Sequence, residues 1–520
     1  MSSTDAPLTG PDLAAGVPAA GVTDGSVLLG HAGGEAVLLT RVGGVLAAIG
    51  ATCTHYGGPL AEGAVVDGTI RCPWHHAAFD LRTGEALRPP ALNPVGCWRV
   101  EERDGLAVVT GRVDRSGAPT AGRASAGSAG GPESVVIIGA GAAGGYAAET
   151  LRREGYDRRV TVIESGPSAP YDRPNLSKDY LAGSAPEEWI PLRPDAFYSD
   201  LGIDMMLGAW VAEIDVAGRR VLLESGAAYD FGALLLATGA EPIRLDLPQA
   251  AQPVRYLRTL ADSRAIIAAA EQARSAVVIG ASFIGLEVAA SLRARGLDVT
   301  VVAPEARPLE KVMGPAVGDF VRALHEDHGV RFRLGQTVAA VGADAVTLSG
   351  GEVVPAELVV AGVGVRPATD LATRAGLANE RGVLVDEFLE TSVPGIYAAG
   401  DIARWPDTRA GERIRVEHWV VAQRQGQSAA RSMMAANRAD RERFDAVPFF
   451  WSAHYDAVIN YAGHAPRWDD AVVSGDLAAR DASVEYRAGG RTLAVATVGR
   501  DRANLEAEVA LERQVAAAHS

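Results

Sequence analysis

Apolar and polar positions follow two different patterns along the chain, and the change between them falls near residue 130. In the first part, short alternating segments are separated by glycine-rich turns, at Ser26–Leu29, Ala36–Arg41, Val45–Ile49, Thr69–Cys72 and Ala107–Thr110. Such segments are typical of the strands of a small antiparallel domain. We therefore expect an all-β domain over residues 22–110, preceded by a tail at residues 1–21.

Beyond residue 132 the pattern becomes apolar strand, glycine turn and long amphipathic helix, and it occurs twice, at residues 135–164 and 276–303. Such alternation predicts parallel sheets with crossover helices. Both copies end in similar strands, Val-Thr-Val-Ile at 160–163 and Val-Thr-Val-Val at 299–302. This similarity indicates an internal duplication of a nucleotide-binding unit.

These patterns predict a multidomain fold with a small all-β domain, two Rossmann-like α/β dinucleotide-binding domains and a C-terminal α+β domain. Residues 111–132 are dominated by Gly, Ala and Ser, a composition typical of a flexible linker. The first dinucleotide-binding domain is expected at 133–250 and 376–446, with the second inserted at 251–375. A helix-like stretch at 418–437 precedes the C-terminal domain at 447–520.

Composition narrows the function classes. The 520 residues are 48% apolar and 22% charged, as in a globular enzyme, and the formal net charge of -15 argues against a nucleic-acid partner. Residues 1–16 lack the basic start and apolar middle of a secretory signal, and no run is long and uncharged enough to span a bilayer. We expect a cytoplasmic protein that does not bind membranes.

The three cysteines all precede residue 100, which indicates metal chemistry confined to one domain and excludes a disulfide framework. Cys53 and His55 lie on one predicted loop, and Cys72 and His75 lie on another. Two thiolates and two imidazoles suit a tetrahedral zinc site by ligand type. Because each loop supplies one Cys and one His, the pattern better suits a two-iron cluster in which one iron takes two Cys and the other two His.

Both loops resemble those of the Rieske ferredoxins, through Cys-x-His-x-Gly-Gly-Pro-Leu at 53–60 and Cys-Pro-Trp-His-x-Ala-x-Phe-Asp at 72–80. The resemblance implies a 2Fe-2S cluster with Cys53, His55, Cys72 and His75 as ligands. Cys97 lies outside both loops and is expected to be a small buried side chain.

The loops also depart from the high-potential branch of that family. Gly58 and Trp74 stand where that branch has two further cysteines, and Ala77 and Phe79 stand where it has a Ser and a Tyr that bond the cluster. Fewer hydrogen bonds leave the reduced cluster less stabilised, so we expect a low-to-middle Rieske potential. His76 replaces the Gly of many relatives and is expected to be a neighbour of the cluster.

Residues 134–144 place a GxGxxG motif after an apolar strand and before an Ala-rich helix. Glycines let the backbone approach a pyrophosphate, which the helix N-terminus then binds. Glu164 ends the second strand and is placed to bind an adenosine ribose. The expected contacts are Gly139, Gly141, Ala143, Gly144 and Glu164; the alternative is a glycine turn that only packs a helix on a sheet.

Residues 234–240 and 391–401 resemble the remaining FAD motifs of the two-dinucleotide flavoprotein reductases. The resemblance implies FAD contacts from Ala237, Thr238 and Gly239, a ribitol contact from Asp401, and a cap on the flavin ring from Glu417, His418 and Trp419. The alternative is that His418 and Trp419 are packing residues at a helix start. The flavoprotein section has no Cys, which excludes disulfide reduction by a redox-active Cys pair.

Residues 172–178 resemble the Arg-Pro-x-Leu-Ser-Lys segment of oxygenase-type ferredoxin reductases. The resemblance implies that Arg173 contacts the flavin cofactor and that Lys178 lies beside its ring, where a cation stabilises reduced flavin. A solvated surface Lys is the alternative.

Residues 276–287 form the second strand, turn and helix unit, in which Ser282 replaces the middle glycine. The segment resembles that of the same reductases and implies nicotinamide-nucleotide contacts from Gly280, Ser282, Ile284, Gly285 and Glu287. Glu287 is expected beside the nicotinamide amide and paired with Lys178, so these two are the candidate catalytic residues.

The choice of coenzyme depends on the end of the next strand. Strand register makes Ala303 the counterpart of Glu164, so the ribose-binding acid is absent there. Glu305 is expected to reach the 2'-hydroxyl of NADH, whereas Arg307 favours the 2'-phosphate of NADPH. We expect NADH. Residues 363–367, which include Gly364, resemble the closing strand of the nicotinamide-nucleotide domain in the same reductases.

The resemblance covers nearly the whole chain, and the order of its domains is similar to that of the apoptosis-inducing-factor-like Rieske oxidoreductases. It implies hydride transfer from NAD(P)H to FAD and one-electron steps through the cluster to an external acceptor, either a redox protein (oxygenase, ferredoxin or cytochrome) or a small molecule. The alternatives are an NADH-responsive redox sensor with little turnover and a cluster that is only structural. The protein is expected to be a monomer or homodimer.

Overall fold

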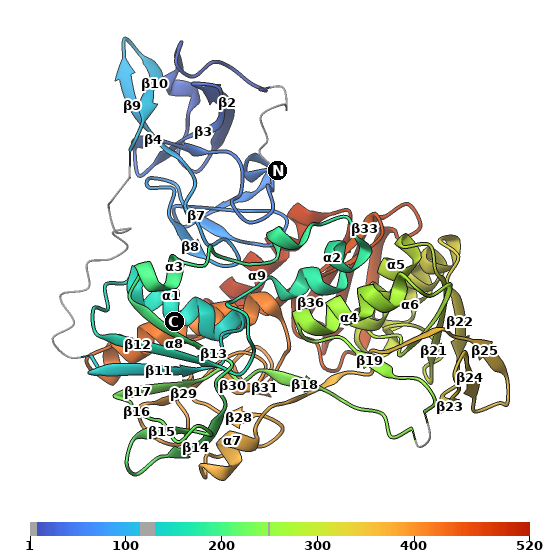
Figure 1. The fold of residues 1–520 in the computed structure, drawn as a ribbon. Helices are drawn as coiled ribbons and strands as arrows, with labels where there is room; N and C mark the ends of the chain where they lie inside the picture. The colour runs from blue at the N-terminus through green and yellow to red at the C-terminus, as the bar shows by residue number, and fades with distance from the viewer. Residues whose placement is uncertain (1–7, 115–130, 248–249, 520) are drawn as a thin grey trace. The chain divides into compact units, whose positions relative to one another are not determined.

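The computed structural model describes residues 8–114, 131–247 and 250–519 (Figure 1). The chain divides into two compact units. Among the described residues, unit 1 comprises 8–114, 153–155 and 500–519, and unit 2 comprises 131–152, 156–247 and 250–499. The predicted linker at 111–132 lies largely outside the described residues.

Unit 1 contains two antiparallel sheets. The first has the strand order β1 (Val17–Pro18), β10 (Leu106–Arg112), β9 (Cys97–Arg103), β4 (Val45–Gly50), β3 (Glu35–Val42) and β2 (Val27–Ala32). The second has the order β5 (Ala64–Val66), β6 (Thr69–Arg71), β7 (Ala78–Asp80) and β8 (Ala86–Arg88). The predicted all-β character is confirmed.

Two features of unit 1 are not visible in the sequence pattern. Strand β1 lies within the segment expected to be a tail and pairs with β10, because two residues are too few to show an alternation. Helix α9 (Asp501–His519) follows the C-terminal sheet in sequence but belongs to unit 1. It provides the side chains that reach the loops of the second sheet.

Unit 2 contains the two predicted dinucleotide-binding folds. The first parallel sheet has the order β13 (Ile203–Leu207), β12 (Arg159–Glu164), β11 (Ser134–Ile138), β17 (Ala233–Leu236) and β29 (Ile396–Ala398). The second has the order β19 (Val254–Tyr256), β26 (Leu358–Ala361), β20 (Ser275–Ile279), β21 (Asp298–Ala303) and β22 (Arg331–Leu334). Helices α1 (Ala142–Arg153) and α5 (Phe283–Ala294) follow β11 and β20, as the duplicated pattern predicts.

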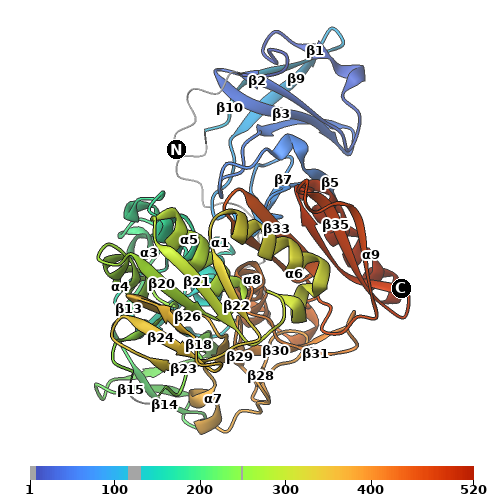
Figure 2. The same cartoon turned by 90° about the vertical axis from the view of Figure 1, so that its right-hand side faces the viewer.

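Helices and small sheets cover both faces of the second sheet. Val278 and Val301 pack with α5 and α6 (Glu310–Asp327), whereas Val277 and Val302 pack with the three-stranded sheet β23 (Val338–Val341), β24 (Ala345–Leu348) and β25 (Val353–Pro355). Figure 2 shows this small sheet on the side away from α5. Burial of both faces accounts for the continuous apolar strands in the sequence.

The C-terminal part of unit 2 is a five-stranded antiparallel sheet. Its order is β32 (Phe449–His454), β33 (Ala457–Gly463), β36 (Arg491–Val498), β35 (Asp481–Ala488) and β34 (Asp470–Asp476). Helix α8 (Trp419–Met434) precedes it, within the stretch predicted to be helical, and α5 packs against β32. This packing brings β32 next to the second dinucleotide fold.

Candidate functional site

The four predicted cluster ligands converge in unit 1. Nδ1 of His55 lies 3.2 Å from Nδ1 of His75, and the thiols of Cys53 and Cys72 are within hydrogen-bonding contact of each other. Both cysteines are buried. Each loop closes on its own backbone, since the Cys53 N–H donates to the Gly58 carbonyl at 2.8 Å. The donor set therefore fits a 2Fe-2S cluster, which takes two thiolates on one iron and two imidazoles on the other.

The surroundings of these ligands have low polarity. The hydrogen bond to Cys72, together with burial, raises the pKa of Cys53, and the same hydrogen bond lowers the pKa of Cys72. Burial lowers the pKa of His55 to about 3, so its imidazole is neutral, as a metal ligand must be. Among the described residues, no three His, Cys, Asp or Glu side chains form a site for a single metal ion.

His76 connects the second ligand loop to helix α9. Its backbone φ is +60°, in the left-handed region that favours glycine. Its Nδ1 is hydrogen-bonded to Glu508, and both side chains are buried. Glu508 also accepts a hydrogen bond from Arg88 at 2.8 Å, while Glu512 pairs with Arg88 and with Arg71, at 2.8 Å and 2.7 Å.

The roles of Glu508 and Glu512 are not evident from the sequence. Two acidic residues four apart on a helix normally indicate a solvated face. The glycine position at His76 is the one signal that points to an unusual backbone at this loop.

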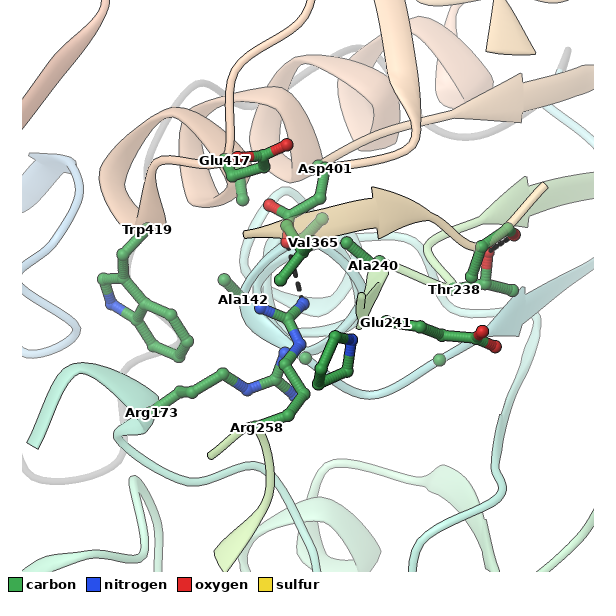
Figure 3. A pocket seen from close by; sticks show the side chains of 18 of the residues that line it. Ala142, Arg173, Thr238, Ala240, Glu241, Arg258, Val365, Asp401, Glu417 and Trp419 are labelled. Carbon is green, nitrogen blue, oxygen red and sulfur yellow. Dashed lines mark hydrogen bonds and ion pairs between the residues drawn. The ribbon is translucent and has the colours of Figure 1, made fainter. Parts of the chain in front are cut away.

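A cavity of about 1220 Å³ lies in unit 2, and Figure 3 shows part of its lining. The following predicted site residues line it: Gly139, Gly141, Ala143, Glu164, Arg173, Lys178, Ala237, Thr238, Gly239, Ser282, Ile284, Glu287, Gly364, Asp401, Glu417, His418 and Trp419. The predicted residues outside the lining are Gly144, Gly280, Gly285 and Glu305.

The glycines outside the lining pack the two turns. A Cβ on Gly144 would lie 1.9 Å from the Gly139 carbonyl oxygen, and a Cβ on Gly285 would lie 2.2 Å from the Gly280 carbonyl oxygen. Only glycine permits this approach of helix to strand. Ser282 replaces the middle glycine of the second turn and caps α5, since its Oγ donates to the Gly362 carbonyl at 2.7 Å and accepts from the Gly285 N–H at 3.3 Å.

Strand register confirms the prediction that Ala303 occupies, in the second fold, the position that Glu164 occupies in the first. The Gly139 N–H donates to the Ile163 carbonyl, and the Gly280 N–H donates to the Val302 carbonyl, both at 2.8 Å. Glu164 accepts from the Ala140 N–H at 2.7 Å, which places its carboxylate beside the first glycine turn. The second fold has buried Ala303 at the equivalent place.

Two cavity-lining side chains carry buried polar atoms without a partner among the described residues. These atoms are Nε of Arg173 and Nδ1 of His418. Burial lowers the pKa of His418 to about 3, so the ring is neutral. Buried polar groups normally have a hydrogen-bond partner. The two orphaned atoms, together with the glycine turns, fit the binding of a polar cofactor such as FAD in this cavity.

Two ion pairs join residues of the cavity lining. Nη2 of Arg258 lies 2.8 Å from Oδ2 of Asp401, and a dashed line marks this ion pair in Figure 3. Nζ of Lys178 lies 2.9 Å from Oε2 of Glu287, which also accepts a hydrogen bond from Ser177 at 2.5 Å. The predicted pairing of Lys178 with Glu287 is therefore present. Arg258 was not anticipated, because it lies in a connection with no recognisable motif.

Glu305 and Arg307 are both paired within unit 2. Glu305 forms an ion pair with the cavity-lining Lys311 at 2.9 Å. The Arg307 guanidinium pairs with Asp319 at 2.8 Å and with Glu310 at 3.1 Å, and these contacts raise its pKa.

No helix among the described residues is long and apolar enough to cross a membrane.

Three families match the sequence. The family described as Pyridine nucleotide-disulphide oxidoreductase matches residues 133–426, the Rieske [2Fe-2S] domain matches residues 17–99, and the family described as Reductase C-terminal matches residues 449–520.

Similar proteins cover most of the chain. Apoptosis-inducing factor 3 of Homo sapiens is 32% identical over 486 residues, which span 89% of this chain and 78% of that protein. Rhodocoxin reductase of Rhodococcus erythropolis is 36% identical over 388 residues, which span 74% of this chain and 90% of that protein. The crystal structure of the covalent putidaredoxin reductase-putidaredoxin complex matches with a TM-score of 0.69 and 35% identity, covering 72% of this chain and 92% of that one.

Proposed function

The chain belongs to the pyridine nucleotide-disulphide oxidoreductase family and carries a Rieske domain, and from this premise we propose that it passes electrons from NAD(P)H through FAD and a 2Fe-2S cluster to an external acceptor. The observation that carries the proposal is the presence in one chain of a dinucleotide cavity and four converging cluster ligands. FAD, when bound, converts a two-electron donor into single electrons, which is what a 2Fe-2S cluster accepts.

We propose that the cavity residues bind and orient the two nucleotides. The glycine turns let backbone N–H groups reach a pyrophosphate, and Glu164 lies where a ribose hydroxyl would meet its carboxylate. Asp401, fixed by Arg258, is a hydrogen-bond acceptor on the cavity wall. Helix α8 begins at Trp419 with its N-terminus at the cavity, so its dipole favours negative charge there.

Lys178 and Glu287 are the proposed catalytic pair. The Lys178 ammonium places positive charge at the cavity, which stabilises an anion that forms beside it. Glu287 holds that ammonium in position and is itself fixed by Ser177 and by Ser452, at 2.5 Å each. The pair thereby places an ammonium and a carboxyl group at one point of the cavity wall.

NADH is the proposed coenzyme. A 2'-phosphate needs an unpaired cation at the end of β21, whereas Arg307 is already held by two carboxylates. Glu305 remains the candidate acceptor for a ribose hydroxyl, through exchange of its contact with Lys311.

The acceptor, by analogy, is a small redox protein. The solved complex of putidaredoxin reductase with putidaredoxin and the name of rhodocoxin reductase show that relatives of the FAD part act on such proteins.

We also propose a monomer or homodimer without a nucleic-acid partner and with a cytoplasmic location. In unit 2, we propose that residues 133–250 and 376–446 bind FAD and that the inserted residues 251–375 bind the nicotinamide nucleotide.

Steady-state oxidation of NADH tests this proposal, with a one-electron dye and with a cytochrome as acceptors. We expect fast turnover with both, and a value of kcat/KM at least tenfold higher for NADH than for NADPH. The second candidate is an NADH-responsive redox sensor with little turnover. A long-lived reduced complex with negligible turnover would support the sensor and overturn the reductase.

A further inference from the structure

A line of hydrogen-bonding side chains runs through unit 2 from Glu287 to Tyr455. Oγ of Ser452 lies 2.5 Å from Oε1 of Glu287 and 3.1 Å from Nε2 of His454. Nδ1 of His454 lies 3.3 Å from Nε2 of His325, and Nδ1 of His325 lies 3.4 Å from the Tyr455 hydroxyl. The line starts at the cavity, which Glu287 lines, and ends at a half-buried tyrosine.

Secondary structure places these side chains in one row. Ser452 and His454 are two residues apart on β32, so both point to the same face of the sheet. Glu287 comes from α5 and His325 from α6. The relative exposures are 2% for Glu287, 1% for Ser452 and 0% for both His454 and His325.

The side chains of this buried row are more polar than the stability of the fold requires. Two imidazoles and a hydroxyl within an apolar cluster lose their hydration and regain it only through hydrogen bonds to one another. Apolar side chains of similar volume would fill the space without that cost. A function that needs continuous hydrogen bonds explains the choice of residues.

Both imidazoles of the row are neutral. Burial, together with the nearby positive charge of Lys178, lowers the pKa of His454 to about 3. Burial, with His454 and His328, also holds the pKa of His325 well below its usual value. A neutral imidazole has one N–H donor and one acceptor nitrogen, so it can take a proton on one side while it gives one up on the other.

The donors along the row form a consistent set. With Glu287 ionised, Ser452 donates to it, so His454 donates from Nε2 to Ser452 and His325 donates from Nε2 to Nδ1 of His454. Tyr455 then donates to Nδ1 of His325. In the reverse set, Glu287 is protonated and each group donates to its neighbour on the Tyr455 side. When every proton moves across its own hydrogen bond, each group then donates towards Glu287, as in the set described first. Glu287 is left ionised, and one proton is released at Tyr455.

The proposed function, on which this inference rests, requires such a release. One NADH gives up a hydride, which is two electrons and one proton, and becomes NAD⁺. The two electrons leave singly to two one-electron acceptors, so one proton remains in the cavity and must reach solvent. Nζ of Lys178 lies 2.9 Å from Oε2 of Glu287, so the carboxyl is in direct contact with a group at the cavity wall.

We propose that Glu287, Ser452, His454, His325 and Tyr455 form a proton relay that carries this proton from the cavity to the surface. Glu287 takes the proton on one oxygen and passes it to Ser452 from the other. Neither histidine becomes a cation, because each gains and loses one proton in the same event.

The direct test follows proton release by the holoenzyme. Protein reduced anaerobically with one equivalent of NADH is mixed with excess ferricyanide in weak buffer that contains a pH-indicator dye. We expect the variants Ser452→Ala and His325→Gln to release the proton at least tenfold more slowly than the wild type. Reduction of His325→Gln by NADH should stay within twofold of the wild type, because hydride transfer requires no proton to leave.

A matched control lies one helical turn from His325. His328 stacks on Tyr455, with ring centroids 3.6 Å apart, but its Nδ1 bonds the Leu324 carbonyl at 2.8 Å and lies outside the row. His328→Gln should release the proton at the wild-type rate. Imidazole at millimolar concentration should restore release in His325→Ala, which leaves space for it, and should not accelerate the wild type.

Nitrogen NMR of histidine-labelled protein gives a readout independent of turnover. The donor set requires that the oxidised holoenzyme have neutral His325 and His454, both with the proton on Nε2. A proton on Nδ1 of either ring, or a cationic ring at neutral pH, would overturn the relay. So would wild-type proton release in folded Ser452→Ala and His325→Gln. Loss of NADH reduction in the wild type would instead overturn the proposed function, so the two failures are distinguishable.

Discussion

His76 and Glu508 form a buried hydrogen bond, although 432 residues separate them in the sequence. The contact ties the loop that carries Cys72 and His75 to helix α9. Arg88 shares the Glu508 carboxylate at 2.8 Å, so the carboxylate neutralises a cation and also fixes a loop with left-handed backbone.

Glu508→Ala should therefore destabilise unit 1. Removing one partner of a buried charge network costs about 3–5 kcal/mol, because the buried His76 imidazole loses the Glu508 carboxylate and the Arg88 guanidinium is left with Glu512 as its carboxylate partner. The melting of the cluster absorbance band measures the effect. Glu506→Ala is the control, since its exposed pair with Arg502 contributes less than about 1 kcal/mol. Equal melting temperatures for the two variants would contradict the prediction.

Cys72→Ser should abolish the cluster and leave the flavin in place. Serine is a harder ligand than a thiolate, and its hydroxyl holds a proton that the metal must displace. Iron and flavin content per chain measure the outcome, with iron expected to fall below a tenth of the wild-type value. Cys97→Ser is the matched control, because Cys97 lies outside both ligand loops and its Sγ donates to the Arg82 carbonyl. Iron retained in Cys72→Ser would show that this thiol is not a ligand.

Arg258→Ala should weaken FAD binding about 10- to 100-fold. The guanidinium orients Asp401 at the cavity, and charged hydrogen bonds of this kind contribute about 1.5–3 kcal/mol. Release of FAD on dilution, followed by its fluorescence, gives the dissociation constant. Arg264→Ala serves as the control, since it removes an exposed pair with Glu187. An unchanged dissociation constant in Arg258→Ala would show that this ion pair does not shape the FAD site.

Acid should destabilise unit 2 through its buried histidines. Burial lowers the pKa of His454 to about 3, whereas an unfolded histidine titrates near 6.5. Between these values the unfolded chain binds a proton that the folded chain does not, so stability falls as the pH falls, by about 1.4 kcal/mol per pH unit for this residue. This loss is absent above about pH 6.5.

His454→Gln tests the sign of this linkage. The variant removes one titrating group, so its melting temperature should fall less steeply between pH 6 and pH 4 than that of the wild type. Calorimetry in two buffers of different ionisation enthalpy counts the protons taken up on unfolding. An unchanged proton count would mean that His454 is already charged in the folded protein.

Local patterns predicted much of the fold. The duplicated strand, turn and helix units appear as β11 with α1 and β20 with α5, because glycine turns and continuous apolar strands are consequences of backbone geometry that acts over a few residues. Register is equally local, which is why Ala303 could be identified as the counterpart of Glu164. The predicted cluster ligands converge for the same reason, since each loop contains its own Cys and His.

Contacts between distant segments that carry no recognisable motif could not be predicted from these patterns. A helical pattern distinguishes apolar from polar faces but does not say which segment meets a polar face, so Glu508 resembled a solvated residue. Arg258 carries no motif, yet its side chain meets Asp401, 143 positions away.

The sequence by itself determined the chemistry available to this protein: thiol and imidazole ligands, glycine turns for nucleotides, and a Lys and a Glu in reductase motifs. The tertiary structure decided which polar groups share hydrogen bonds, including the row from Glu287 through His454 to His325. The physical reason is that motif spacing follows from local backbone geometry. The partners in this row lie 129 or 165 residues apart, so they come into contact only when sheets and helices pack. Polar groups buried by this packing lose water and form hydrogen bonds with one another instead.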